Sequence, residues 1–229
     1  MIRWDAPGPY AVAFTTREGG VSEGAFASLN LAHRGGDDDA RVDENRRIAC
    51  EGLGLDVARL AVNRQRHSAT VVRAEPGITD ALGDCLWSDT VGVPMLALAA
   101  DCVPIAIART DGPAALAVVH AGWRGLADGV IDASVRALGA GETAAIVGPS
   151  CGPCCYEVGA EVSVRFDPDL TTGRILDLWS AAERALQRAG VAIIERVDLC
   201  TRCNPALFFS HRATGEPRGS QGVIGAVTG

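Results

Sequence analysis

The chain has 229 residues, of which 48% are hydrophobic and 21% charged, and its formal net charge is −7. This composition is typical of a folded domain and excludes a largely disordered chain. Its strong bases are all arginines, spread along the sequence, so the chain lacks the basic face with which nucleic-acid-binding proteins neutralise phosphates. Because this length is short for two domains, we expect one catalytic domain spanning residues 1–229.

The first residues contain no basic segment followed by an apolar run, so nothing marks export. The most apolar stretch, Pro94–Ala108, contains Asp101 and is shorter than the roughly 20 residues that a membrane helix needs. We therefore expect a soluble, cytoplasmic protein that binds neither membranes nor nucleic acids. There the eight cysteines should be reduced, which favours metal binding over a disulfide framework. The oligomeric state stays open.

Apolar segments and helical patterns alternate irregularly along the chain. Apolar segments that are typical of buried strands cover 10–16, 60–62, 69–73, 95–99, 103–108, 115–120, 143–148, 191–197 and 223–227. Apolar residues at helical spacing predict helices over 42–51, between 121 and 138, and over 175–189. Interleaved strands and helices indicate an α/β fold, and their irregular spacing argues against a regular β-α-β repeat.

Three segments place a metal-ligating side chain at the end of an apolar strand. They are Gln65-Arg66-His67, Ala100-Asp101-Cys102 and His120-Ala121-Gly122. Two imidazoles and one thiolate suit zinc and leave the fourth tetrahedral position for water or substrate. The same ligands also hold copper. Because the three residues lie far apart in the sequence, they form no local metal motif, and each can instead be an ordinary core or surface residue.

Two arginines are candidates for binding an anion. Arg124 begins a predicted helix just after His120, and helix N-termini with a nearby arginine favour anions. Arg46, beside Asn45, is the second candidate. For each, the alternative is an ion pair with a neighbouring acidic residue.

The cysteines of the C-terminal half allow two further interpretations. Cys151-Gly152-Pro153-Cys154 has the sequence of a thioredoxin-type redox motif, but its late position fits that motif poorly. The pairs Cys151/Cys154 and Cys200/Cys203 can also form a structural four-cysteine zinc site, although they are farther apart than in zinc ribbons. The sequence favours neither interpretation.

Together these segments resemble the YfiH-like, or laccase-domain, family. Its members are also described as multicopper polyphenol oxidases, as peptidoglycan editing factors and, more recently, as zinc-dependent purine nucleoside phosphorylases. The resemblance covers nearly the whole chain and rests on Ser28-Leu29-Asn30-Leu31, Asn45-Arg46, Gln65-Arg66-His67, Ala100-Asp101-Cys102-Val103-Pro104, His120-Ala121-Gly122-Trp123-Arg124-Gly125, residues 148–159, Cys200-Thr201 and residues 208–212. It implies a layered α/β/β/α fold with mixed sheets, similar to the catalytic domain of cytotoxic necrotising factors.

The resemblance also implies a function. It places the metal ligands on His67, Cys102 and His120, with Zn2+ or Cu2+ as the ion. It implies phosphorolysis of adenosine, inosine, guanosine and methylthioadenosine, accompanied by adenosine deamination, which a zinc ion assists by activating water.

For phosphorolysis, we expect Arg46 and Arg124 to bind phosphate. Asp84 or Asp101 would handle protons or ribose hydroxyls. Cys102 and His120 would take part in catalysis as metal ligands.

The sequence departs from the family pattern in two places. Gln65-Arg66-His67-Ser68 stands where the family has Gln-Val-His-Gly. Arg218-Gly219-Ser220-Gln221 stands where the family ends with Thr-Gly-Arg-Gln, so an arginine is missing before the glutamine. If that arginine contacts substrate, its loss changes activity or specificity.

Three other functions remain alternatives. Cys102 can be a nucleophile with His120 as its base, in a hydrolase that acts on peptidoglycan precursors. Copper-dependent phenol oxidation is the second, although a multicopper cluster needs more imidazoles than the four histidines of this chain. The third is a structural metal module, which predicts a closed shell of four ligands.

Overall fold

Two mixed β-sheets form the centre of the molecule, which the computed structural model describes from Met1 to Gly229. In spatial order, the five-stranded sheet contains β1 (Ile2–Trp4), β2 (Tyr10–Phe14), β13 (Gln221–Val227), β6 (Met95–Ala99) and β3 (Ala61–Val62). The six-stranded sheet contains β12 (Ile193–Arg196), β9 (Thr143–Val147), β7 (Val103–Arg109), β8 (Leu116–Ala121), β5 (Cys85–Ser88) and β4 (Val71–Arg73). Both sheets combine parallel and antiparallel pairs.

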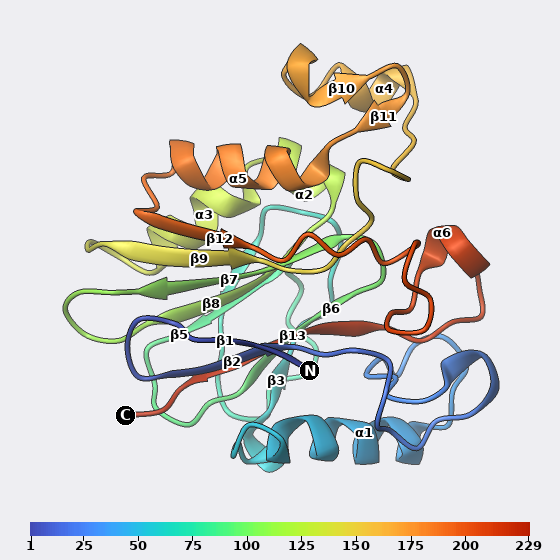
Figure 1. The fold of residues 1–229 in the computed structure, drawn as a ribbon. Helices are drawn as coiled ribbons and strands as arrows, with labels where there is room; N and C mark the ends of the chain where they lie inside the picture. The colour runs from blue at the N-terminus through green and yellow to red at the C-terminus, as the bar shows by residue number, and fades with distance from the viewer.

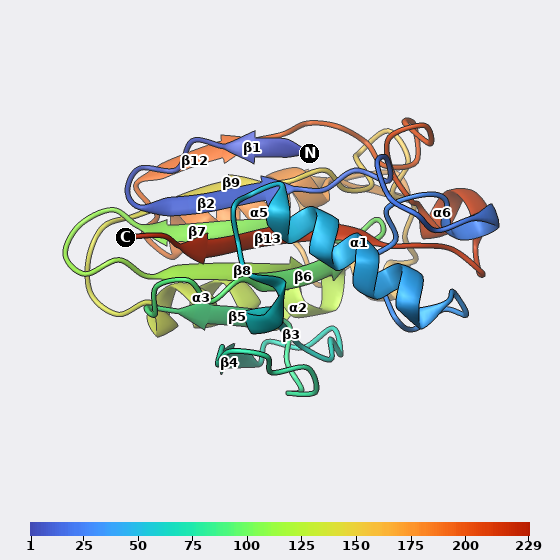
Figure 2. The same ribbon diagram turned by 90° about the horizontal axis from the view of Figure 1, so that it is seen from below.

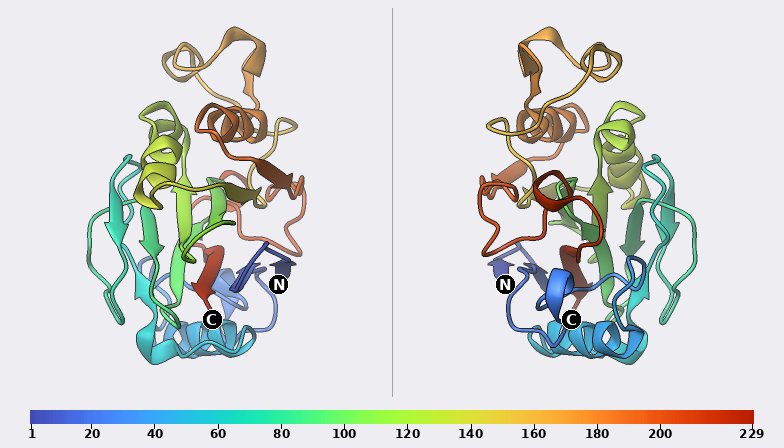
Figure 3. Two further views of the ribbon diagram at one scale, coloured as in Figure 1. Left: turned by 90° about the vertical axis from the view of Figure 1, so that its left-hand side faces the viewer. Right: turned by 90° about the vertical axis from the view of Figure 1, so that its right-hand side faces the viewer.

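Helices cover the outer face of each sheet. They are α1 (Asp39–Glu51), α2 (Trp123–Ala127), α3 (Val130–Ala137) and α5 (Leu178–Arg188), whereas the short helices α4 (Ala160–Ser163) and α6 (His211–Thr214) lie outside these layers. Figure 1 shows α1 against the five-stranded sheet, and α2, α3 and α5 against the six-stranded sheet. Seen from below, α1 crosses the strands of its sheet (Figure 2), and the end-on views show the layers stacked one on another (Figure 3).

This arrangement is the layered α/β/β/α fold with mixed sheets that we predicted. A short hairpin of β10 (Thr171–Thr172) and β11 (Ile175–Leu176) extends beyond the helices of the six-stranded sheet. None of the helices combines the length and the apolar composition needed to cross a membrane.

The alternation of side chains along the strands builds three apolar layers. In β13, Val223 and Val227 belong to the core between the sheets, whereas Ile224 and Ala226 pack toward α1. Strand β7 faces the helices of its own sheet with one set of alternate residues and the other sheet with the next. Successive side chains of a strand point to opposite faces, so a strand that is apolar throughout must be covered on both sides.

The predicted strands are present, and all three predicted helices have different bounds. The helix expected over 42–51 begins three residues earlier, at Asp39, where the Asp38 side chain caps it. The helix expected between 121 and 138 is divided into α2 and α3 at Gly129, which has a left-handed φ of 87° that favours glycine. The helix expected over 175–189 begins only at Leu178. The Asp177 side chain accepts a hydrogen bond from the backbone N–H of Ser180 and thereby caps α5, while the two preceding residues pair as β11.

Strands β6 and β7 follow one another in the sequence but belong to different sheets. The chain crosses between the sheets at Ala100-Asp101-Cys102, where Asp101 has a φ of 91°. Such a φ is unusual for a residue other than glycine and is maintained only by the surrounding structure. Here Asp101 Oδ1 accepts a hydrogen bond from Thr201 Oγ1 at 2.6 Å, and Oδ2 accepts one from the Arg212 backbone at 2.7 Å. The crossing places Cys102 at one end of the two sheets.

Candidate active site

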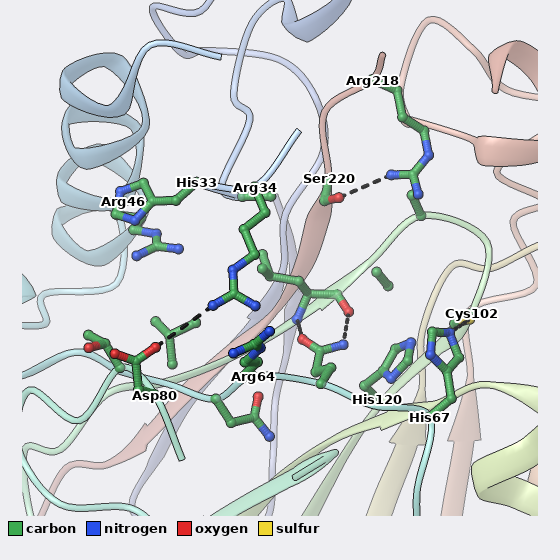
Figure 4. A pocket seen from close by; sticks show the side chains of 18 residues that line it. His33, Arg34, Arg46, Arg64, His67, Asp80, Cys102, His120, Arg218 and Ser220 are labelled. Carbon is green, nitrogen blue, oxygen red and sulfur yellow. Dashed lines mark hydrogen bonds and ion pairs between the residues drawn. The ribbon is translucent and has the colours of Figure 1, made fainter. Parts of the chain in front are cut away.

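His67, Cys102 and His120 come together at the end of the sheets where β3 and β6 finish (Figure 4). Their candidate ligand atoms all lie within 4.8 Å of one another. His67 Nε2 is 3.7 Å from Cys102 Sγ, and the two imidazole rings meet nearly at right angles, with centroids 4.8 Å apart. The antiparallel register of β7 and β8 accounts for part of this convergence, since Val103 pairs with Ala121.

The buried carboxylate of Asp84 positions both histidines. Its Oδ1 lies 2.9 Å from His120 Nδ1 and accepts the backbone N–H of His67, also at 2.9 Å. Its Oδ2 accepts hydrogen bonds from the backbone N–H and the hydroxyl of Ser68, each at 2.7 Å. Because His120 Nδ1 is held in this way, its Nε2 is the nitrogen left for a metal ion or for Cys102. Carboxylates that orient metal-binding histidines act in this manner.

Gly122 lets the loop after β8 pass directly over the three side chains. A Cβ at this position would lie 2.8 Å from His67 Cδ2 and 3.1 Å from Cys102 Sγ. Contacts this short require His67 or Cys102 to move. Glycine at this place in the His120-Ala121-Gly122 segment is therefore explained by close packing over the site.

The electrostatics of the trio favour a thiolate beside an imidazolium when no cation is bound. Burial alone would raise the pKa of the Cys102 thiol, but the charge of His120 and hydrogen bonds from both imidazoles outweigh it and lower the pKa to about 6. Burial alone would lower the pKa of His120, whereas the Cys102 thiolate and Asp84 together raise it to about 9. A centre with this negative charge and two imidazole nitrogens attracts a divalent cation as well as protons.

The donor set fits a zinc-type ion. Zinc bonds of about 2.0–2.3 Å in tetrahedral geometry place ligand atoms roughly 3.3–3.6 Å apart. The 3.7 Å between His67 Nε2 and Cys102 Sγ is close to this spacing. Two imidazoles and one thiolate also suit copper, so the donor atoms indicate a zinc or copper ion rather than magnesium or calcium.

A cavity of about 510 Å³ opens beside the trio. His67, Cys102 and His120 line it on one side, and four arginines contribute to the rest of its wall: Arg34, Arg46, Arg64 and Arg218. Asp80 is its one acidic lining residue, and its carboxylate lies 3.8 Å from Arg34. In a chain with a net charge of −7, this concentration of guanidinium groups marks a place for an anion.

Arg46, one of the two predicted phosphate ligands, lies in this cavity. It projects from α1, is only 8% exposed, and its Nε donates to the carbonyl of Leu31 at 2.9 Å. No carboxylate forms a salt bridge with Arg46 or Arg64, and burial lowers the pKa of Arg46. A buried guanidinium without a counter-ion is costly, and an anionic ligand would relieve that cost.

The other predicted residues lie outside the cavity, and the structure gives them different contacts. Arg124 is exposed, and its guanidinium lies 5.0 Å from the ring of Trp123 rather than in the cavity. The Asp101 carboxylate is occupied by Thr201 and Arg212, as described above. Asp84 is 0% exposed and has no free face toward a substrate. The expected contacts of Arg124, Asp101 and Asp84 with a substrate are therefore corrected, since none of the three lines the cavity. The two aspartates instead position the chain around the metal ligands.

Sequence reasoning missed several residues of the cavity. Asn63 and Arg64 directly precede the Gln65-Arg66-His67 segment, and this adjacency was the available signal. The Oδ1 of Asn63 is buried without a hydrogen-bond partner, as is the Nε of Arg218. Buried polar atoms that lack partners beside a cavity favour a polar ligand.

Ser220 stands at the position of the missing family arginine, and Arg218 lies beside it. Its Nη1 is 3.2 Å from the hydroxyl of Ser220, so its guanidinium lies against the side chain of the substituted position. Arg218 thus brings a positive charge to the part of the cavity wall that Ser220 lines.

Comparison with known proteins assigns the chain to a family. The model of the multi-copper polyphenol oxidoreductase laccase family matches residues 11–227. The chain belongs to this laccase-domain, YfiH-like family. A Pseudomonas aeruginosa protein named purine nucleoside phosphorylase is 37% identical to it over 223 residues, which cover 91% of this chain and 90% of the relative.

Solved structures of the family have the same fold. The crystal structure of a Neisseria meningitidis protein matches with a TM-score of 0.90 at 34% identity, covering 99% of this chain and 97% of that one. YlmD from Geobacillus stearothermophilus matches with a TM-score of 0.87 at 31% identity, covering 99% and 94%. The family name refers to several copper ions, but only two of the four histidines of this chain, His67 and His120, belong to the metal centre. His33 contacts Asp43 at 2.7 Å, and His211 lies 3.7 Å from Glu216.

Proposed function

We propose that this chain is a metal-dependent purine nucleoside phosphorylase that acts on adenosine, inosine, guanosine and methylthioadenosine. The observation that carries the proposal is one cavity that combines a histidine–cysteine metal centre with four arginines. Relatives at 30–37% identity are named purine nucleoside phosphorylases, which supports the reaction class. A phosphorylase needs to hold a nucleoside and a phosphate side by side, and the two walls of this cavity suit those two ligands.

In phosphorolysis a phosphate oxygen attacks C1′ of the ribose, the bond from C1′ to the purine nitrogen breaks, and the departing base takes up a proton. Arg46 and Arg64 are suited to bind the phosphate because neither has a carboxylate partner. Arg218 adds a third guanidinium from the opposite segment of the cavity wall. Holding both reactants in one orientation is the main source of acceleration that these residues provide.

The polar atoms that remain free suit the nucleoside. Asn63 Oδ1, buried and unpartnered, can accept a hydrogen bond from a ribose hydroxyl or from an N–H of the base. His67, Cys102 and His120 would hold a zinc ion, which supplies a Lewis acid at that end of the cavity. Asp84 would orient the His120 imidazole toward this point and fix the backbone of His67 beside it.

The test is a product analysis of zinc-loaded enzyme incubated with adenosine and inorganic phosphate. A phosphorylase forms adenine and ribose 1-phosphate in equal amounts, and omission of phosphate stops the reaction. Inosine formed without phosphate would show the adenosine deamination that we propose as a companion activity. If no purine base is released from adenosine, inosine or guanosine in the presence of phosphate, the proposed function is wrong.

The Cys102–His120 pair supports a second candidate, a cysteine hydrolase. A thiol with a pKa of about 6 next to a base is suited to nucleophilic attack when no metal is bound. The same sulfur cannot both bind a metal ion and attack a substrate freely. A covalent adduct on Cys102 after incubation of metal-free enzyme with a peptidoglycan-precursor amide, together with loss of hydrolysis on zinc addition, would favour the hydrolase.

A further inference from the structure

Four cysteines outside the active site form a second cluster of sulfur atoms. The sulfurs of Cys154, Cys155, Cys200 and Cys203 all lie within 4.8 Å of one another. Cys203 Sγ is 3.3 Å from that of Cys155 and 3.6 Å from that of Cys154. The four thiols come from two segments almost fifty residues apart, so their meeting is a property of the fold.

Two rigid turns hold these thiols in place. Ser150 and Cys200 form a parallel bridge, through which Ser150 accepts the backbone N–H of Thr201 at 3.0 Å. The first turn is closed by the N–H of Cys155 on the carbonyl of Gly152 at 2.9 Å. In the second turn, Asn204 donates to the carbonyl of Cys200 from both its backbone and its side chain. The four thiols therefore meet through defined backbone contacts.

The geometry points to a second metal site: we propose that Cys154, Cys155, Cys200 and Cys203 bind one structural zinc-type cation. A tetrahedral ion with four bonds to sulfur of about 2.3 Å spaces the sulfurs about 3.8 Å apart. The observed separations, from 3.3 Å to a limit of 4.8 Å, lie on both sides of this value. Four thiolates favour soft ions such as zinc over magnesium or calcium.

The surroundings of the cluster support this assignment. The backbone N–H of Gly152 donates to Cys200 Sγ at 3.4 Å, and such a bond stabilises a thiolate. Cys154 and Cys203 are exposed, so a cation can reach the cluster from solvent. Apolar packing gives no reason for two cysteines at the surface, whereas a shared cation does. The four ligands differ by one residue from the four-cysteine site that the sequence left open, since Cys151 is fully buried outside the cluster and Cys155 takes its place.

The proposed ion would stabilise the loop that carries Cys102. Thr201, the residue after ligand Cys200, donates to Asp101 Oδ1 at 2.6 Å. The backbone N–H of Cys151 donates to the carbonyl of Asp101 at 3.0 Å. Asp101 directly precedes Cys102, so both cysteine-bearing segments contact the strained turn that delivers the active-site thiol. The cation thus has a structural role that is independent of the proposed reaction.

The first test measures zinc content per chain. Purified protein loaded with zinc should contain two equivalents. The double variant C154S/C203S should lose one equivalent, C102S should lose the other, and the combined variant should retain none. Cobalt(II) in the wild type should give the intense sulfur-to-cobalt absorption of a four-thiolate site. In C154S/C203S that absorption should fall to the level of a one-thiolate site. One equivalent in both the wild type and C154S/C203S would overturn the proposal.

The second test needs no variant and therefore does not depend on folding of a mutant. Native protein is alkylated before and after treatment with a chelator, and modified cysteines are located by peptide mass spectrometry. The four thiols should be protected until the chelator removes the ion. Protection that ends only on addition of a reductant would show a disulfide instead, and thiols that react from the start would show an empty cluster. Either of these results contradicts the proposal.

Discussion

Replacing Asp84 with asparagine keeps the shape of the side chain but removes the charge that holds the His120 imidazole and the His67 backbone. The carboxylate accepts hydrogen bonds through both of its oxygens, and it is 0% exposed. If the new amide group takes the place of Oδ2, the backbone N–H of Ser68 loses its acceptor. If it takes the place of Oδ1, the backbone N–H of His67 and the Nδ1 of His120 lose theirs. No orientation of the amide satisfies all of these groups.

The size of the effect follows from this count. A buried donor left without an acceptor costs about 1–3 kcal/mol, and loss of the carboxylate charge weakens the remaining bonds. We therefore expect D84N to lower the free energy of unfolding by at least about 1–3 kcal/mol. Removal of a carboxylate that orients metal-binding histidines typically weakens metal affinity by about 10–100-fold. The proposed phosphorolysis should fall with the bound metal.

Zinc affinity is measured by competition with a chromophoric chelator, and stability by urea unfolding of the metal-free protein. D169N is the matched control, because Asp169 is exposed and pairs only with Arg184, far along the chain from the site. It should keep the affinity of the wild type. If D84N also retained both that affinity and the stability of the wild type, Asp84 would not position the histidines and our account of the centre would fail.

Three further predictions test other parts of the site. Gly122→Ala should weaken zinc binding at least tenfold, because its Cβ would lie 2.8 Å from the His67 ring; unchanged affinity in the same chelator assay would contradict the close packing. Arg218→Ala should raise the KM for phosphate about tenfold or more, since charged hydrogen bonds contribute about 1.5–3 kcal/mol. The control variant Arg124→Ala should keep the KM of the wild type. Equal KM values in the two variants would show that Arg218 does not bind phosphate. Burial alone would raise the pKa of Asp37, but hydrogen bonds from Asn30 and Ser22 lower it, so its contribution to stability is present above about pH 4 and is lost at lower pH. The difference in unfolding free energy between wild type and Asp37→Asn should accordingly shrink between pH 5 and pH 2, and a difference that grows there would show the sign to be wrong.

Local sequence patterns predicted most strands because strands buried on both faces are continuous apolar runs. The same runs carry no information about which sheet a strand joins. Strands β6 and β7 are equally apolar and adjacent in sequence, yet they lie in different sheets, and the turn at Asp101 that separates them depends on contacts with Thr201 and Arg212. Two predicted helix bounds were wrong for a local reason. Gly129 divides one helical pattern into two helices, and the capping residue Asp177 makes the other helix begin later than the apolar spacing alone predicts.

The metal trio and the anion-binding wall differ in how far the sequence predicts them. Ligand chemistry and the family motifs pointed to His67, Cys102 and His120, because few residue types bind a zinc-type ion. Arginine is abundant in this chain, so residue type alone did not separate Arg64, which lines the cavity, from Arg124, which lies at the surface. Both side chains are exposed, and neither forms a salt bridge with a carboxylate, so the distinction depends only on where the fold places each of them relative to the cavity.

Comparison with the family position by position underestimates the positive charge in the wall of this cavity, as Arg218 shows. Compared by position, residue 220 is a serine where the family has arginine, and a guanidinium is lost. In space, the Arg218 side chain reaches that serine, with Nη1 at 3.2 Å from its hydroxyl and Nη2 at 3.3 Å from Glu216. The small side chain at 220 leaves room for the longer one from 218, and we therefore expect Arg218 to replace an arginine at 220. If so, Ser220→Arg in the present chain should add no phosphate affinity and should instead lower it, because two guanidinium groups would compete for one place. The double variant that combines Arg218→Thr with Ser220→Arg should restore the phosphate KM of the wild type, whereas a KM as high as that of Arg218→Ala would show that the two positions are not interchangeable.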